Sequence, residues 1–100
     1  MYARLTRIQV RVERVEHSVK IFKESIVSAT KAQKGYRGVF LFLNENTGEA
    51  VTLGLWDSEK DCLASEDNHF YQEQLVKVMN FLTAPPVREG YEVAFCDLNL

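Results

Sequence analysis

The segment YRGVFLFLNENTGEAVTLGLW, residues 36–56, constrains the fold of this chain more than any other part of the sequence. Two runs rich in β-branched, aromatic and other apolar residues flank NENTGE, whose Asn and Gly residues favour turn conformations. The segment therefore predicts a β-hairpin. Both faces of the run VFLFL are apolar, so we expect helices to cover one face and a further layer, such as a second copy of the sheet, to cover the other.

The residues before the hairpin predict a strand followed by a helix. Residues 2–12 alternate between polar and apolar side chains, which is typical of a half-buried strand. From Glu13 to Gly35 the apolar residues fall instead on one helical stripe, at Val15, Val19, Phe22, Ile26 and Ala29. We therefore expect one long amphipathic helix that ends at the glycine.

The residues after the hairpin predict two short helices, or one kinked helix, and a last strand. Ser58 is a candidate N-cap, with Asp61 completing a weak variant of the capping box. Asn68 is a candidate cap for a second helix, whose apolar stripe comprises Tyr71, Leu75, Val78 and Leu82. The prolines of TAPP end that helix, and the alternating residues 87–98 predict the last strand.

The resulting order, β-α-β-β-α-β, predicts an α+β fold of the ferredoxin-like type with a four-stranded antiparallel sheet. The first and third strands are central and antiparallel in that topology, so Trp56 is expected beside Tyr2, Ala3 and Arg4. The last strand also runs antiparallel to the first, which would bring Phe95 and Cys96 to the same end of the sheet.

Composition bounds the class of protein. Residues 1–100 contain 46% hydrophobic residues and two prolines, which predicts one compact domain without a linker. No apolar run approaches the roughly 18 residues of a membrane span, and the N-terminus lacks a secretory signal, so we expect a cytoplasmic protein without a membrane partner. Because a small domain leaves much of its surface unburied, we also expect self-association as a homodimer.

Charge is distributed unevenly along the chain, although the net charge is only -2. Residues 1–38 hold nine basic and three acidic residues, and the remainder holds three basic and eleven acidic residues. We expect the two halves to neutralise each other, within the chain or across a dimer, and predict no nucleic-acid partner. The alternative is anion binding near the first strand.

No metal site is predicted. Cys62 and Cys96 lack the spacing of metal ligands, as do the two histidines, and no glycine-rich phosphate loop is present. Two cysteines in a reducing compartment are more often small buried hydrophobic residues than a disulfide.

The run GYRGVFLFLNENTGEAVTLGLWDSEKDCLASED, followed by FYQEQL, resembles the antibiotic biosynthesis monooxygenase family of dimeric α/β barrels. The resemblance covers essentially the whole chain and makes residues 1–100 a single domain of that type. It implies a homodimer in which two four-stranded sheets pack into a barrel with the helices outside. The family includes cofactor-independent oxygenases of polycyclic phenols, quinol oxygenases, haem-degrading enzymes and many proteins of unknown activity, so the fold does not select a reaction.

Transfer of the family's site residues is incomplete. Trp56 matches a tryptophan that lines the pocket of the polyketide-oxidising relatives, but Thr52 and Cys62 replace an asparagine and a tyrosine of that pocket. The haem-degrading relatives use an asparagine, a second tryptophan and a histidine, where this chain has Ala3, Ser65 and Leu75. The resemblance therefore implies neither haem nor another cofactor.

Six residues are candidates for a functional site. Trp56 shares its strand face with Thr52 and Gly54, whose small size leaves room for a ligand, although Trp56 could equally anchor the core or a dimer interface. Three other side chains could add polar groups. His69 stands at the positive end of a predicted helix, which would keep its imidazole neutral and usable as a base, unless the residue is simply exposed. Arg4 could bind a phenolate or carboxylate, or pair with an acidic residue. Tyr71 is either a pocket residue or a packing residue.

These observations lead to two functional hypotheses. The first is a cofactor-independent monooxygenase that acts on a small aromatic or quinol-like compound, with His69 and Trp56 as its catalytic residues. The alternative is a non-catalytic dimeric α/β barrel that binds a small hydrophobic ligand or serves a structural role. Convergent polar groups in a pocket above Trp56 favour the first, and a filled space favours the second.

Overall fold

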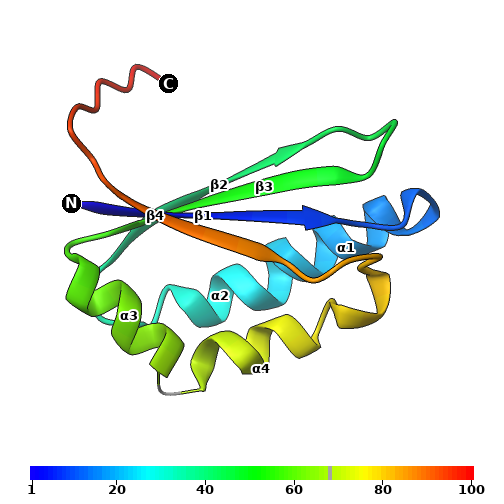
Figure 1. The fold of residues 1–100 in the computed structure, drawn as a ribbon, viewed down its shortest axis with the longest axis horizontal. Helices are drawn as coiled ribbons and strands as arrows, with labels where there is room; N and C mark the ends of the chain where they lie inside the picture. The colour runs from blue at the N-terminus through cyan, green and yellow to red at the C-terminus, as the bar shows by residue number, and fades with distance from the viewer. Residues whose placement is uncertain (68) are drawn as a thin grey trace.

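The computed structural model describes residues 1–67 and 69–100 and confirms the α+β prediction. Within these residues, four antiparallel strands form one sheet in the order β2-β3-β1-β4, as Figure 1 shows. The strands are β1 (Tyr2–Gln9), β2 (Tyr36–Leu43), β3 (Glu49–Trp56) and β4 (Val87–Glu92). The two central strands are thus the first and the third along the chain, as in the ferredoxin-like topology.

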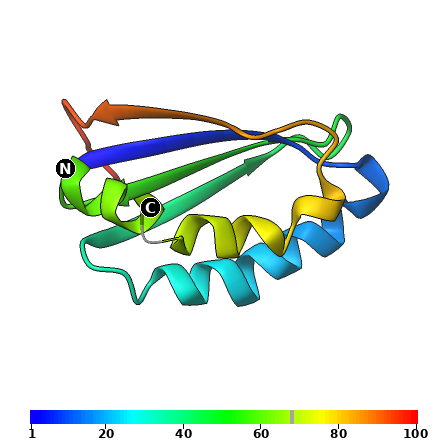
Figure 2. The same ribbon diagram turned by 60° about the horizontal axis from the view of Figure 1, so that its bottom comes forward.

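All the helical segments lie on one face of the sheet (Figure 2). The first crossover begins with a 3₁₀ turn and continues as a single helical rod, and the second contains two helices and a closing turn. Their bounds are η1 (Val12–Arg14), α1 (Val15–Ile21), the π-helical η2 (Phe22–Ile26), α2 (Val27–Thr30), α3 (Glu59–Asp67), α4 (Phe70–Val76) and η3 (Met79–Phe81). None of the described helices is long and apolar enough to span a membrane.

Local sequence chemistry explains where these elements begin and end. The amide of Asp61 donates a hydrogen bond to Ser58 Oγ at 3.2 Å, which confirms Ser58 as the cap of α3. Gly35 precedes β2 with a left-handed φ of 83°, as expected of a glycine after a helix. Asn68, the cap expected for the second helix, lies outside the described residues.

Pairing of β1 with β3 sets the two faces of the sheet. Tyr2 is opposite Trp56 and Arg4 is opposite Gly54, so the prediction that Trp56 lies beside the start of the first strand is confirmed. Side chains alternate along a strand, so Arg4 and Thr6 share the helix-covered face with the even-numbered residues 52–56 of β3. The odd-numbered residues of both strands occupy the other face.

Much of that other face is apolar, and it has no helix over it (Figure 2). Its side chains come from three strands: Leu5 of β1, Phe40 and Phe42 of β2, and Val51, Leu53 and Leu55 of β3. The rings of Phe40 and Phe42 stack with their centroids 5.8 Å apart, and Phe42 remains 52% exposed. The expectation that a further layer covers the run VFLFL therefore concerns this face.

The first and last strands along the chain are both shorter than the sequence predicted. The first ends at Gln9 instead of residue 12, and Val10 forms only an isolated bridge with Leu82. The last strand ends at Glu92 instead of residue 98. Its neighbour β1 begins at Tyr2, and the final hydrogen bond between the two segments runs from the amide of Val93 to the carbonyl of Met1. Among the described residues, no strand continues beyond Met1 with which residues 94–98 could pair.

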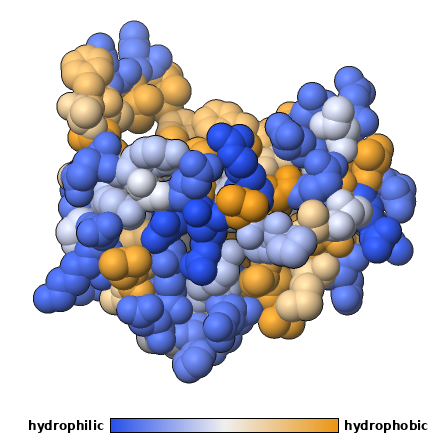
Figure 3. Space-filling model, in the orientation of Figure 1, coloured by the Kyte–Doolittle hydropathy of each residue, from blue (hydrophilic) through white to orange (hydrophobic). Residues whose placement is uncertain are grey.

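Phe95 and Cys96, expected at the same end of the sheet as Trp56, follow the last residue of β4 and are exposed. Residues 93–100 leave the sheet on the side opposite the helices (Figure 1), and Phe95 is 83% exposed. Figure 3 shows hydrophobic residues next to hydrophilic ones on this projecting segment.

Three ion pairs connect the basic N-terminal part of the chain with acidic residues that follow it, as the charge distribution predicted. They are Arg4 with Glu66, Arg7 with Glu89, and Arg37 with Asp57. The last two are exposed and contribute little to stability individually.

The turn of the hairpin generates a test of the fold. Gly48 has a left-handed φ of 79°, and a Cβ added there would overlap the carbonyl oxygen of Val10. We expect Gly48→Ala to lower the free energy of unfolding by about 1 to 3 kcal/mol, measured by urea denaturation. Gly38→Ala is the matched control, because nothing lies within 4 Å of its added Cβ. Equal losses in the two variants would contradict this account.

Candidate functional site

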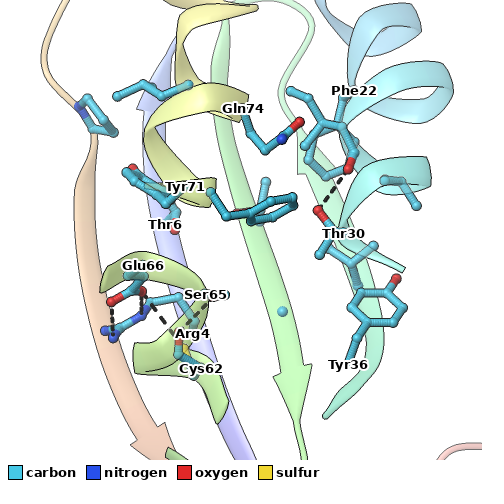
Figure 4. Close-up of a pocket in the computed structure, with 18 of the residues that line it drawn as sticks. Arg4, Thr6, Phe22, Thr30, Tyr36, Cys62, Ser65, Glu66, Tyr71 and Gln74 are labelled. Carbon is cyan, nitrogen blue, oxygen red and sulfur yellow. Dashed lines mark hydrogen bonds and ion pairs between the residues drawn. The ribbon is translucent and has the colours of Figure 1, made fainter. Parts of the chain in front are cut away.

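A cavity of about 170 Å³ lies between the helix-covered face of the sheet and the helices. Strands β1, β2 and β3 form its floor, and η2, α2, α3 and α4 form its walls (Figure 4). Most of its lining is apolar or aromatic. The lining residues include Ile8, Phe22, Ile26, Val27, Tyr36, Val39, Trp56, Phe70, Leu75 and Val78.

The floor beside Trp56 is open because two of its neighbours are small. Thr52, Gly54 and Trp56 alternate along β3 and all line the cavity. A Cβ at Gly54 would lie 3.4 Å from the indole Nε1, so the missing side chain leaves space directly beside the ring. Trp56 is also a core residue, 6% exposed, with Tyr36 packed edge-on at a centroid distance of 6.1 Å.

One helical wall contains the π-helical turn. Phe22 and Ile26, the first and last residues of η2, both line the cavity. A π-helical turn shifts the register of the side chains that follow it, and such turns are frequent at functional sites. The hydroxyl of Thr30 donates to the carbonyl of Ile26 at 2.7 Å and remains at the cavity wall.

An ionic cluster occupies one end of the cavity. Arg4 Nε lies 2.7 Å from Glu66 Oε1, and Nη2 donates to Oε2 at 3.1 Å. The Nε–H bond itself is poorly aligned and makes no hydrogen bond within the described part of the chain. Arg88 Nη1 approaches the same carboxylate at 3.4 Å, so two guanidinium groups against one carboxylate leave one net positive charge.

Two further groups of this end remain protonated. Burial raises the pKa of the Cys62 thiol, and Glu66 raises it further, while Arg4 opposes the shift. Burial likewise raises the pKa of the Tyr71 phenol, although Arg88, whose guanidinium carbon lies 4.2 Å from the ring centroid, opposes it. Both groups can therefore donate hydrogen bonds, and Cys62 is a poor nucleophile.

Five of the six sequence-predicted site residues line this one cavity: Arg4, Thr52, Gly54, Trp56 and Tyr71. His69 does not. It lies exposed at the N-cap of α4 with a left-handed φ of 68°, and its Nδ1 lies 3.0 Å from Gln72 Oε1. The imidazole of His69 therefore lies at the surface of α4 and outside the cavity lining.

Sequence reasoning missed several polar residues of the cavity, among them Glu66 and Gln74. Glu66 is one helical turn beyond Cys62 on α3, and Gln74 interrupts the apolar stripe of α4 between Tyr71 and Val78. The polar Gln74 within an apolar helical stripe was the sequence signal that could have identified this residue as part of a site. Across residues 1–67 and 69–100, no group of three or more His, Cys, Asp or Glu side chains is arranged to hold a metal ion.

A sequence profile described as "antibiotic biosynthesis monooxygenase" matches residues 1–73. The chain belongs to that family. None of the curated protein sequences matches significantly.

Solved structures show the same fold at low sequence identity. A candidate antibiotic biosynthesis monooxygenase from Nitrosomonas europaea superposes with a TM-score of 0.77 at 14% identity, covering 95% of this chain and 100% of that one. A conserved protein from Methanosarcina mazei gives 0.75 at 18% identity, covering 91% of both chains. A Streptomyces coelicolor monooxygenase in complex with the ligand nanaomycin D gives 0.73 at 14% identity, covering 99% and 92% respectively.

The partly buried ion pair generates a second test. Its side chains are only 17% and 14% exposed, so Glu66→Gln would leave the Arg4 charge poorly solvated. We expect a loss of on the order of 3 kcal/mol in the free energy of unfolding, measured by chemical denaturation. Glu89→Gln, which breaks the exposed pair with Arg7, is the control and should have a much smaller effect. A comparable loss in that control would argue against a special role for burial at Arg4.

Proposed function

We propose that this chain is a cofactor-independent monooxygenase that acts on a small aromatic or quinol-like compound bound in the cavity beside Trp56. The observation that carries the proposal is a largely apolar cavity that ends at an ionic cluster with one net positive charge. An apolar pocket with a few convergent polar groups is the usual form of a small-molecule site. Membership of the monooxygenase family supports oxygenation as the class of reaction.

The arrangement suits chemistry that proceeds through a substrate anion. An activated phenol or quinol that loses a proton becomes electron-rich, and the positive cluster at Arg4 stabilises the developing oxyanion. A carbon of that anion then forms a bond with dioxygen. After protonation the hydroperoxide loses water, so the substrate carbon becomes a carbonyl and the second oxygen atom ends in water.

The base in this scheme is a water molecule bound at the cavity. His69, the base first considered, lies outside the lining and contacts Gln72 instead. Glu66 is engaged in ion pairs with Arg4 and Arg88, so its carboxylate oxygens are already occupied by guanidinium groups. The protein therefore contributes electrostatic stabilisation of the anion more than direct proton abstraction.

Oxygen consumption tests this proposal. We expect turnover of at least one compound in a panel of anthrones, quinols and phenols, measured with an oxygen electrode. Gly54→Val should lower kcat/KM at least roughly tenfold, because its side chain would project into the space beside the indole. Trp56→Phe should also lower it, since the smaller ring leaves the ligand poorly packed.

His69→Ala is the matched control and should leave the rate unchanged, because the imidazole lies on the surface. Absence of oxygen uptake with every compound would overturn the proposed reaction. Unchanged rates in both Gly54→Val and Trp56→Phe would overturn the proposed site.

The position of His69 also favours a second candidate function. Without a histidine at the cavity, the same pocket could bind a small hydrophobic ligand and leave it unchanged. In that case ligand affinity would fall in Gly54→Val while no product forms with any panel compound. Mass spectrometry of compounds that copurify with the protein separates the two functions, because an oxygenated product appears only in the first.

We further propose that the chain forms a homodimer through the uncovered face of the sheet. The apolar side chains on that face, which include Phe40, Phe42 and Leu53, have no covering helix. Burial of such a surface is strongly favourable, and a second copy supplies a complementary sheet. The expected pairing of two sheets matches what the family resemblance implies.

Substitution on this face tests the dimer. Phe42→Asp places a charge on a side chain that is 52% exposed in the single chain, so the monomer should still fold while association is lost. We expect light scattering to report a dimer for the unmodified protein and a monomer for the variant. Val76→Asp, on the exposed side of α4 at 64% exposure, is the control and should remain a dimer. A monomeric unmodified protein would refute the proposed assembly.

A further inference from the structure

Gln74 is a buried polar residue on the cavity wall that the proposed reaction does not use. It is 8% exposed and lies in the apolar stripe of α4, between Tyr71 and Val78. Burying an amide among apolar side chains is unfavourable unless its polar atoms find partners. The hydrogen-bond partners of the amide oxygen and the amide nitrogen therefore indicate the role of Gln74.

Among the described residues, only the oxygen of the amide has a hydrogen-bond partner. Lys77 Nζ donates to Gln74 Oε1 at 2.7 Å. An ammonium group has donors and no acceptor, so the atom that faces it must be the oxygen, and the orientation of the amide is fixed. Nε2 makes no hydrogen bond with any residue of the described ranges, and its two N–H groups are left for a molecule in the cavity.

Gln74 and the ionic cluster lie at opposite ends of the site. Figure 4 shows the group of Arg4, Glu66 and Cys62 at one end, Gln74 at the other, and Tyr71 between them. The residues along the path between the two ends are mainly aromatic or aliphatic. The cavity therefore has a polar group at each end and an apolar middle.

The volume of the cavity is suited to a single ring. It is about 170 Å³, and an apolar cavity of about 150 Å³ holds a benzene molecule. One six-membered ring with small substituents therefore fits. Oxygen atoms at opposite positions of that ring would face the two polar ends.

We propose that Gln74 is a ligand-binding residue whose amide donates a hydrogen bond to one oxygen of a para-dioxygenated benzene, while the other oxygen lies at Arg4. Lys77 is a positioning residue that holds the amide oxygen and directs the N–H groups into the cavity. This proposal depends on the ligand site of the proposed function and specifies its substrate class. It does not depend on oxygenation taking place.

Anaerobic calorimetry tests the proposal, with the emission of Trp56, the only tryptophan of the chain, as a second readout. Hydroquinone and 4-methylphenol are the probes, because they differ by one oxygen at nearly equal volume. We expect hydroquinone to bind about five- to tenfold more tightly than 4-methylphenol, as one net hydrogen bond provides. Gln74→Leu should abolish this preference and leave the affinity for 4-methylphenol nearly unchanged.

Three variants complete the experiment. Gln72→Leu, the same change on the exposed side of the same helix, should keep the full preference. Lys77→Met should reduce the preference when Gln74 is present and have no effect in the Gln74→Leu background. Gln74→Glu retains size and a partner for Lys77 but lacks N–H donors, so it should lose the preference even if the leucine variant folds poorly.

Equal affinities for the two probes in the unmodified protein, or a preference that survives both Gln74 substitutions, would overturn the proposal. An intact hydroquinone preference without oxygen uptake would overturn the proposed reaction and support the role of Gln74.

Discussion

The pairing of β1 with β3 is the constraint on which the rest of the structure depends. Its register places Tyr2 opposite Trp56 and Arg4 opposite Gly54. A shift of one residue would turn every side chain of β1 to the other face of the sheet. Arg4 would then project from the uncovered face, away from Glu66, and Leu5 would enter the cavity. The ionic cluster, the space beside the indole and the apolar outer face all follow from this one register.

The charged end of the cavity is costly to the fold. Arg4 and Glu66 are mostly buried, and removing two charges from water offsets much of their mutual attraction. Apolar residues of similar volume would give a comparable or better core. A cluster that retains one net positive charge beside a largely apolar cavity is better explained by the binding of an electron-rich or anionic ligand than by stability alone.

Much of the architecture was predictable because the relevant forces are local. Residues 36–56 specify a hairpin through alternating β-rich runs and a turn of Asn and Gly, and Ser58 specifies a helix start through its hydroxyl. The end of the last strand was not predictable from its own residues. Tyr91 and Val93 continue the alternation, but a strand needs a neighbour, and β1 ends the ladder at Met1. Likewise, the helical period of residues 13–34 gives no indication of the π-helical turn at Phe22.

The candidate site, like the fold, was predictable from the sequence only in part. By itself, the sequence determined the order of elements, the small residues Thr52 and Gly54 beside Trp56, and the candidate residues Arg4 and Tyr71, because alternation and helical periodicity assign each side chain to a face. Only the tertiary structure decided that Glu66 and Gln74 face the same cavity and that His69 does not. Those placements depend on the angle at which α3 and α4 cross the sheet. That angle arises from packing between residues far apart in the chain, which no local pattern encodes.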